Sequence, residues 1–146
     1  MRIALFEPDI PQNAGTILRL AACLGVGVDI IEPTGFPSTD KAFRRAGMDY
    51  LDHVELRRHI SWQAFETWRA ESGARLILAT TKGDMPYTAF AFRPSDIILM
   101  GRESAGAPAF VHEAAQTATL IEALRQTDGW PAIADPENLT PASEHP

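Results

Sequence analysis

DIILMGRESAGAP, residues 96–108, joins a strongly apolar run to a glycine-rich loop. The run 96–100 is too apolar for a strand with one solvated face, so it predicts a strand that is buried on both faces. The residues after Pro108 have helical character. Strand, glycine-rich loop and helix in succession are typical of α/β proteins, which bind ligands at the carboxyl ends of parallel strands. The stretch therefore predicts a fold class and the place of a ligand site.

Further apolar runs alternate with helical segments along the chain. RLILATT (75–81) resembles 96–100 in character, and RIALFEP (2–8) is a buried strand that a proline ends. We expect strands at 2–8, 26–33, 52–56, 75–81 and 96–100, and helices at 10–25, 41–45, 62–72, from Pro108 onward and at 117–126. The sequence predicts an α/β fold, with a mostly parallel sheet and helices on both of its faces.

Composition bounds the organisation of the chain. With 146 residues, 45% of them hydrophobic and 22% charged, we expect one globular domain over 1–131. Residues 132–146 are rich in proline and polar residues, which predicts a disordered tail. No run is long enough to span a bilayer and no signal peptide is evident, so a soluble, cytoplasmic protein is expected. Cys23, the single cysteine, is expected to be a small buried thiol, and no metal site is predicted.

The formal net charge of −6 is unevenly distributed. Within 41–60, basic residues outnumber acidic ones, so a selective contact with nucleic acid is possible. A solvated charged surface is an equally good interpretation of this segment. The basic residues are Lys41, Arg44, Arg45, Arg57 and Arg58.

Three loops after predicted strands are candidates for ligand binding: 7–15, 80–86 and 101–108. None has the pattern of a P-loop or of a dinucleotide fingerprint. Gly101 and Gly106 would let peptide groups approach a flat ligand such as an adenosine-like cofactor, although ordinary turns use glycine too. Upstream, Asn13 can cap the helix that follows, and Arg19 would ordinarily be a solvated helix residue.

Four segments in this order carry a resemblance to a known family: LFEPDIPQNAGTILRLAACLG, IIEPTGFPSTDKAFRRAGMDY, ATTKG and LMGRESAGAP. They resemble the SPOUT methyltransferases, and among them the small tRNA 2'-O-methyltransferases that modify the wobble nucleotide. The resemblance covers residues 1 to about 115. It resumes at 117–131, which is similar to the last helix of the family.

The resemblance implies a C-terminal trefoil knot, a homodimer, S-adenosyl-L-methionine as methyl donor and a tRNA anticodon loop as acceptor. Asn13 and Arg19 match the first motif of the family, in which the arginine is catalytic. Arg44 and Arg45 match a segment suited to RNA. The positions that match cofactor-binding loops are Ala79, Thr80, Met100, Gly101, Arg102, Glu103 and Gly106.

The role of Arg19 needs a chemical interpretation. Arginine stays protonated in proteins, so it is a poor general base for a ribose hydroxyl. We expect Arg19 to orient the adjacent phosphate and to stabilise the developing alkoxide charge.

One part of the family pattern is missing. Between Ala115 and Thr117 the family has a further strand and the third cofactor loop, whereas this chain has Gln116 alone. Either the sequence given omits residues of the protein, or the protein has a true deletion at this point. We favour the first, because loss of a central strand from a knotted fold predicts poor folding.

The residues leave other functions open. Methylation of another RNA site fits the same motifs. A non-catalytic RNA-binding module of the same fold would agree with a true deletion, and a nucleotide-binding α/β protein of another activity is a weaker alternative.

Overall fold

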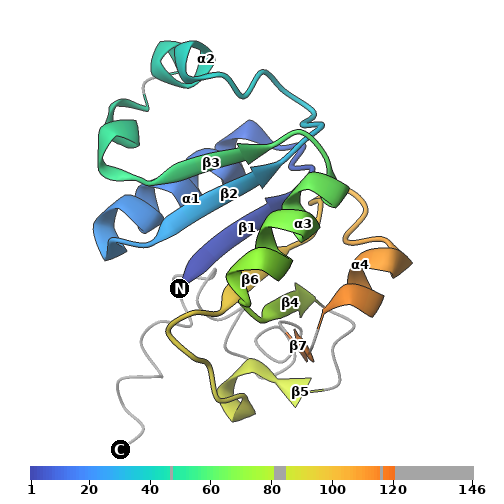
Figure 1. Cartoon of the computed structure of the whole chain (residues 1–146). Helices are drawn as coiled ribbons and strands as arrows, with labels where there is room; N and C mark the ends of the chain where they lie inside the picture. Colours follow the sequence, from blue (N-terminus) through green and yellow to red (C-terminus); the bar gives the residue numbers. More distant parts are fainter. Residues whose placement is uncertain (47, 81–84, 116, 121–146) are drawn as a thin grey trace, which may run out of the picture.

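The computed structural model describes residues 1–46, 48–80, 85–115 and 117–120 (Figure 1). Within them, seven strands form one sheet in the order β3-β2-β1-β6-β4-β7-β5, and every neighbouring pair is parallel. The strands are β1 Arg2–Phe6, β2 Gly27–Ile31, β3 Leu56–His59, β4 Leu76–Thr80, β5 Met85–Pro86, β6 Ile97–Met100 and β7 Thr117–Leu120. The predicted parallel sheet is confirmed.

Helices cover both faces of this sheet, as predicted (Figure 1). The α-helices are α1 Pro11–Leu24, α2 Asp40–Arg45, α3 Trp62–Ser72 and α4 Ala109–Ala114, with 3-10 turns η1 Asp49–His53 and η2 Tyr87–Ala89. On one face, Leu18 of α1 is fully buried with Leu5 and Ile30. On the other face, Phe65 of α3 and Val111 of α4 are fully buried in a second cluster. Helices α1, α3 and α4 thus each present an apolar side to the sheet.

The starts of the helices follow local chemistry, with one correction. Ser61 caps α3, because its hydroxyl accepts a hydrogen bond from the Ala64 amide at 3.1 Å. Asn13 was expected to cap α1, but that helix already begins at Pro11 and has no side-chain cap. Proline suits the first helical position because its φ angle is preset and its missing amide proton has no partner there. Asn13 is therefore an exposed residue inside the first turn.

Two further expectations are wrong in detail. The third strand was expected at 52–56, but 49–53 form η1 and the strand lies at Leu56–His59. Cys23 was expected to be buried, but it is exposed. Helix α1 buries Ala14, Leu18 and Ala21, so Cys23 falls on the opposite side of the helix.

The segment after α4 is also a correction. A helix was expected at 117–126, but Thr117–Leu120 form β7, which pairs in parallel with β4 and β5. The open edge of β4 offers backbone partners to this segment, and that pairing overrides the helical pattern. The rest of the expected last helix, the knot passage and the tail at 132–146 lie outside the described residues.

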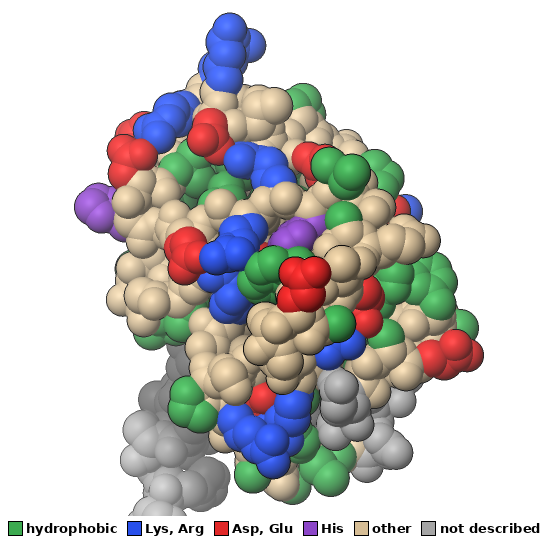
Figure 2. Space-filling model, in the orientation of Figure 1, with side chains coloured by type: hydrophobic (Ala, Val, Ile, Leu, Met, Phe, Trp, Pro, Cys, Tyr) green, Lys and Arg blue, Asp and Glu red, His purple; other side chains and the backbone are tan. Residues whose placement is uncertain are grey.

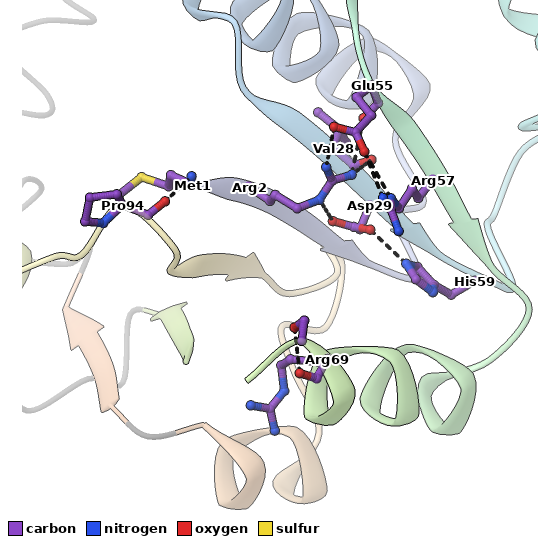
Figure 3. A network of polar contacts seen from close by, with 10 residues as sticks. Met1, Arg2, Val28, Asp29, Glu55, Arg57, His59, Arg69 and Pro94 are labelled. Carbon is purple, nitrogen blue, oxygen red and sulfur yellow. Dashed lines mark hydrogen bonds and ion pairs between the residues drawn. The ribbon is translucent and has the colours of Figure 1, made fainter. Parts of the chain in front are cut away.

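A polar network ties the three strands β1, β2 and β3 together (Figure 3). Asp29 is fully buried. Its Oδ2 atom accepts a hydrogen bond from Arg2 Nε at 2.6 Å, and its Oδ1 atom lies 2.8 Å from His59 Nε2. Arg2 also pairs with Glu55 at 3.1 Å. A buried carboxylate is stable only when its charge is paired and hydrogen bonded, as it is here.

Candidate active site

The carboxyl ends of β1, β4 and β6 lie at one edge of the sheet (Figure 1). Strand β1 lies between β2 and β6, so the chain leaves β1 toward one side of the sheet and later returns on its other side. In open α/β sheets, ligands bind outside the strand ends at such a switch point. The loops that meet there are 7–10 and 101–108.

The loop after β6 is a tight turn of backbone. Arg102 and Gly106 form an antiparallel bridge, with their amides and carbonyls 3.0 and 2.6 Å apart. A Cβ atom on Gly101 would lie 2.6 Å from the amide nitrogen of Ala107, which a real side chain could not tolerate. Gly106 has a φ angle of +68°, in the left-handed region that favours glycine. Both predicted glycines are therefore required by this turn.

Two contacts join this turn to the loop after β1. Arg102 donates hydrogen bonds to the backbone oxygen of Glu7 at 3.2 Å and to its carboxylate at 2.9 Å. The amide of Asp9 donates to Glu103 Oε2 at 3.0 Å, and Ser104 donates to the Asp9 carboxylate. Hydrogen bonding to the side chains of Glu103 and Ser104 holds the pKa of Asp9 below its ordinary value.

A pocket of 240 Å³ opens between the ends of β4 and β6. Six of the seven residues predicted to bind a cofactor line it, and Met100 does not. The Met100 side chain packs instead against the core cluster on the α1 side of the sheet. The lining residues are Leu78, Ala79, Thr80, Gly101, Arg102, Glu103, Gly106 and Ala107.

A second pocket, of 470 Å³, lies along the exposed side of α1. Arg19 lines it together with Gln12 and Thr16, which share its helix face, and with Tyr50 of η1. The guanidinium carbon of Arg19 lies 5.8 Å from the centre of the Tyr50 ring. Asn13 is absent from this lining, and its position on α1 directs it to another side of the helix.

The two pockets share no lining residue. One chain therefore brings the predicted cofactor residues together, but does not place Arg19 among them. The predicted RNA-binding residues lie at the end of α2, next to Ala46, which lines the second pocket. Basic residues are interleaved with acidic ones along the α2 and β3 side of the molecule (Figure 2).

Arg44 and Arg45 differ in their surroundings. Both are exposed, but Arg44 pairs with Asp52 at 2.7 Å. The hydrogen bond between them raises the pKa of Arg44 and lowers the pKa of Asp52. Among the described residues, the Arg45 side chain has no hydrogen bond or ion pair, so its full charge faces solvent.

Sequence reasoning did not assign several residues of these sites. Glu7 and Asp9 hold the glycine-rich turn, and Tyr50 contacts Arg19. All three lie inside segments that resemble the family, but contacts between residues far apart along the chain leave no periodic pattern in a single sequence. In the described residues, no helix has the length and hydrophobicity needed to cross a bilayer.

Comparison with curated proteins finds close relatives. A tRNA (cytidine(34)-2'-O)-methyltransferase of Beijerinckia indica subsp. indica is 61% identical over 119 residues, which is 82% of this chain and 74% of the relative. An Ancylobacter novellus protein of the same name is 49% identical over 150 aligned residues, 89% of this chain and 95% of the relative. That alignment exceeds the 146 residues of the chain, so the relative contains residues that have no counterpart here.

The connection after Ala115 is short. In this sequence, Gln116 alone separates Ala115 from Thr117. The expectation that residues are omitted from this connection stays a prediction, and an intact mass of the protein would test it. In the structure, β7 begins at Thr117, shortly after α4 ends at Ala114.

Solved structures agree with this relationship. One that describes the 2-OH methylation of C/U34 on tRNA is 38% identical with a TM-score of 0.74, covering 82% of this chain and 78% of the other. The SpoU methyltransferase AviRb of Streptomyces viridochromogenes, in complex with the cofactor AdoMet, has a TM-score of 0.72 at 23% identity. It covers 83% of this chain and 48% of the other, and this likeness concerns the fold alone. The model of the SpoU rRNA methylase family matches residues 1–129, and the chain belongs to this family.

Proposed function

We propose that this protein transfers a methyl group from S-adenosyl-L-methionine to the ribose 2'-hydroxyl of the wobble nucleotide in a tRNA anticodon loop. The observation that carries the proposal is the pocket between the ends of β4 and β6, which gathers six predicted cofactor residues in a chain of the SpoU family. The names of the relatives, which are 49–61% identical, support tRNA as the acceptor. The protein is proposed to act in the cytoplasm, as one domain over 1–131.

The pocket residues suit an adenosine-like donor. Leu78, Ala79 and Ala107 offer apolar surface for a flat ring, while the turn at 101–106 exposes peptide groups close to it. Glu103 lines the pocket, and its carboxylate can accept hydrogen bonds from hydroxyl groups. When it is bound, the donor would supply an electrophilic methyl group, and these residues would bind and orient it.

Arg19 is proposed to act on the acceptor. Its guanidinium can bind a phosphate next to the target ribose and stabilise the negative charge that develops on the 2'-oxygen as the hydroxyl proton passes to water. Because Arg19 and the donor pocket are separate in one chain, we propose a homodimer in which Arg19 of one subunit serves the pocket of the other. Asn13 lies on the same helix but outside the Arg19 pocket, and is also proposed to contribute to catalysis.

Arg44 and Arg45 are proposed to contact the RNA backbone. They lie on the α2 segment that leads to the Arg19 pocket, so bound RNA could reach both. Phosphate contacts of this kind give affinity and strong salt dependence.

The test uses the purified full chain, labelled donor and tRNA transcripts that carry cytidine or uridine at the wobble position. We expect label at the wobble 2'-oxygen, and a large but measurable reduction of the transfer rate in Arg19→Ala. A transcript with a 2'-deoxy wobble nucleotide is the matched control and must remain unlabelled. Label at another nucleotide would favour methylation of a different RNA site, and would overturn the wobble assignment.

A non-catalytic RNA-binding module is the second candidate, and the short connection between α4 and β7 is the observation that favours it. The missing residues correspond to the third cofactor loop in the family resemblance. Calorimetric titration with S-adenosyl-L-methionine separates the two candidates. Binding supports the enzyme, whereas no heat at millimolar donor, combined with retained tRNA binding, leaves only the module.

A further inference from the structure

We propose that Tyr50 is a positioning residue that holds Arg19 in its working orientation. The inference rests on the proposed function, because it assigns Arg19 to the acceptor side of the methyl transfer. Arg19 lies on the exposed side of α1, and in the described part of the chain its side chain makes no hydrogen bond or ion pair. Its one described partner is the Tyr50 ring, with 5.8 Å between the guanidinium carbon and the ring centre.

The ring face suits this task. A guanidinium group is attracted to the electron-rich face of an aromatic ring, and the contact leaves its N–H groups free to bind a phosphate. A carboxylate partner would occupy those N–H groups and neutralise the charge. Tyr50 can therefore restrict the orientation of Arg19 without competing with the RNA.

Tyr50 is itself fixed to α1. Its hydroxyl donates a hydrogen bond of 2.7 Å to the backbone oxygen of Gly15, one turn before Arg19. Gly15 is buried, and a Cβ atom there would lie 2.9 Å from Met48 Cε and 3.7 Å from the Tyr50 hydroxyl oxygen. A side chain at Gly15 would require the Met48 methyl group to shift, whereas the Tyr50 hydroxyl lies at an ordinary contact distance.

The pocket around Arg19 and Tyr50 could admit a nucleotide of the RNA. Its volume is 470 Å³, and Gln12, Thr16 and Arg19 add polar groups from one helix face. Met48 and Tyr50 form its wall on the η1 side. A nucleotide of the RNA can enter here with its phosphate toward Arg19, while the donor occupies the other pocket.

Two variants separate the role of the Tyr50 ring from the role of its hydroxyl group. Tyr50→Phe keeps the ring and loses the hydrogen bond to Gly15, whereas Tyr50→Leu removes the ring. We expect Tyr50→Leu to lower kcat about 10-fold or more, since misplaced catalytic groups have effects up to about 100-fold, with the donor Kd unchanged. Tyr50→Phe should retain most of the wild-type kcat. Tyr87→Leu is the matched control, because Tyr87 is the other tyrosine of the chain and lines neither pocket.

A double-mutant cycle tests the coupling. In an Arg19→Ala background, Tyr50→Leu should cause no further loss in transfer, because Arg19 is the group that it positions. Equal losses in both backgrounds would overturn the proposal and leave Tyr50 a merely structural residue. Melting temperatures of all variants identify any loss that comes from unfolding.

A measurement without catalysis keeps the inference separate from the proposed function. The Arg19 Nε–H signal in NMR spectra, assigned with Arg19→Lys, should show a ring-current shift that Tyr50→Phe keeps and Tyr50→Leu abolishes. The same cycle is then measured as binding of a labelled anticodon stem-loop. If the wild type transfers no methyl group, the proposed function fails, but coupled binding losses still support the role of Tyr50. Additive binding losses, or an unshifted Arg19 signal, would count against it.

Discussion

Arg102 binds both the backbone oxygen and the side-chain carboxylate of Glu7, a residue 95 positions earlier in the chain. Glu7 has a φ angle of +43°, in the left-handed region that residues other than glycine seldom adopt. The two hydrogen bonds hold Glu7 in this conformation, and they hold the glycine-rich turn against the end of β1. Arg102 thus joins two loops of the proposed active site.

Replacing Arg102 should therefore weaken the donor site. We expect Arg102→Ala to raise the Kd for S-adenosyl-L-methionine about 10-fold, which corresponds to about 1.4 kcal/mol. Arg102→Lys should recover little, because one ammonium group cannot reproduce both hydrogen bonds of the guanidinium. Calorimetry measures the Kd, and the exposed Arg93 provides the control Arg93→Ala. Equal affinity for wild type and Arg102→Ala would show that the turn does not need this contact.

Adding a single methyl group at Gly101 should abolish binding of the donor. Gly101→Ala would place Cβ 2.6 Å from a backbone nitrogen, so the turn must open and the donor pocket must change shape. We expect loss of measurable donor binding. Gly73→Ala is the comparison, since Gly73 has a φ angle of +72° but no atom within 4 Å of a Cβ. That variant should lose about 1 kcal/mol of stability and still bind the donor.

Arg45 should matter more than Arg44 for RNA affinity. Asp52 partly neutralises Arg44, whereas Arg45 keeps its full charge, so Arg45→Ala should cause the larger rise in the Kd for tRNA. Each lost phosphate contact should reduce the slope of log K against log salt by about 0.7–0.9. Fluorescence anisotropy at about 50 to 200 mM salt measures both the Kd for tRNA and its dependence on salt. A larger effect from Arg44→Ala would mean that RNA displaces Asp52.

Acid should destabilise the protein through Asp96. This carboxylate is fully buried and accepts hydrogen bonds from Arg75 at 2.8 and 2.6 Å, which hold its pKa below the ordinary value. A lowered pKa in the folded state means that the stabilisation is complete above about pH 4 and is lost as pH falls through the folded-state pKa.

The measurement is urea unfolding of the wild type and Asp96→Asn at several pH values. At pH 7 we expect the variant to lose about 1–3 kcal/mol, and this difference should shrink at acidic pH. Glu113→Gln, at an exposed position on α4, should track the wild type. A difference between wild type and Asp96→Asn that stays constant from pH 7 into the acid range would contradict this assignment.

The apolar runs were sufficient to predict the parallel sheet, because a strand buried on both faces leaves few positions for polar residues. It was harder to predict which side of a largely apolar helix faces solvent. LRLAACLG has no polar residue to mark its solvent side after Arg19, so the exposure of Cys23 could not be seen. Residues Thr117–Leu120 form a strand because they pair with β4. This partner lies far away in the sequence, so the local pattern of residues could not indicate it.

The candidate site divides in the same way. The family motifs predicted the residues around the donor pocket, because those residues are contiguous in short segments. Tyr50 and Glu7 could not be assigned, since each matters through a contact with a residue far away in sequence: Tyr50 with Gly15 and Glu7 with Arg102.

The contact between Glu7 and Arg102 also sets an order of events during synthesis on the ribosome. Strands β1, β2 and β3 can pair once the first 59 residues have emerged, but the other side of β1 waits for β6. The donor site needs the turn that ends at Gly106 and cannot form on any shorter nascent chain. A ribosome that stalls before this point would release a fragment with half a sheet, an unpaired β1 edge and no donor pocket, and such a fragment would depend on chaperones to avoid aggregation.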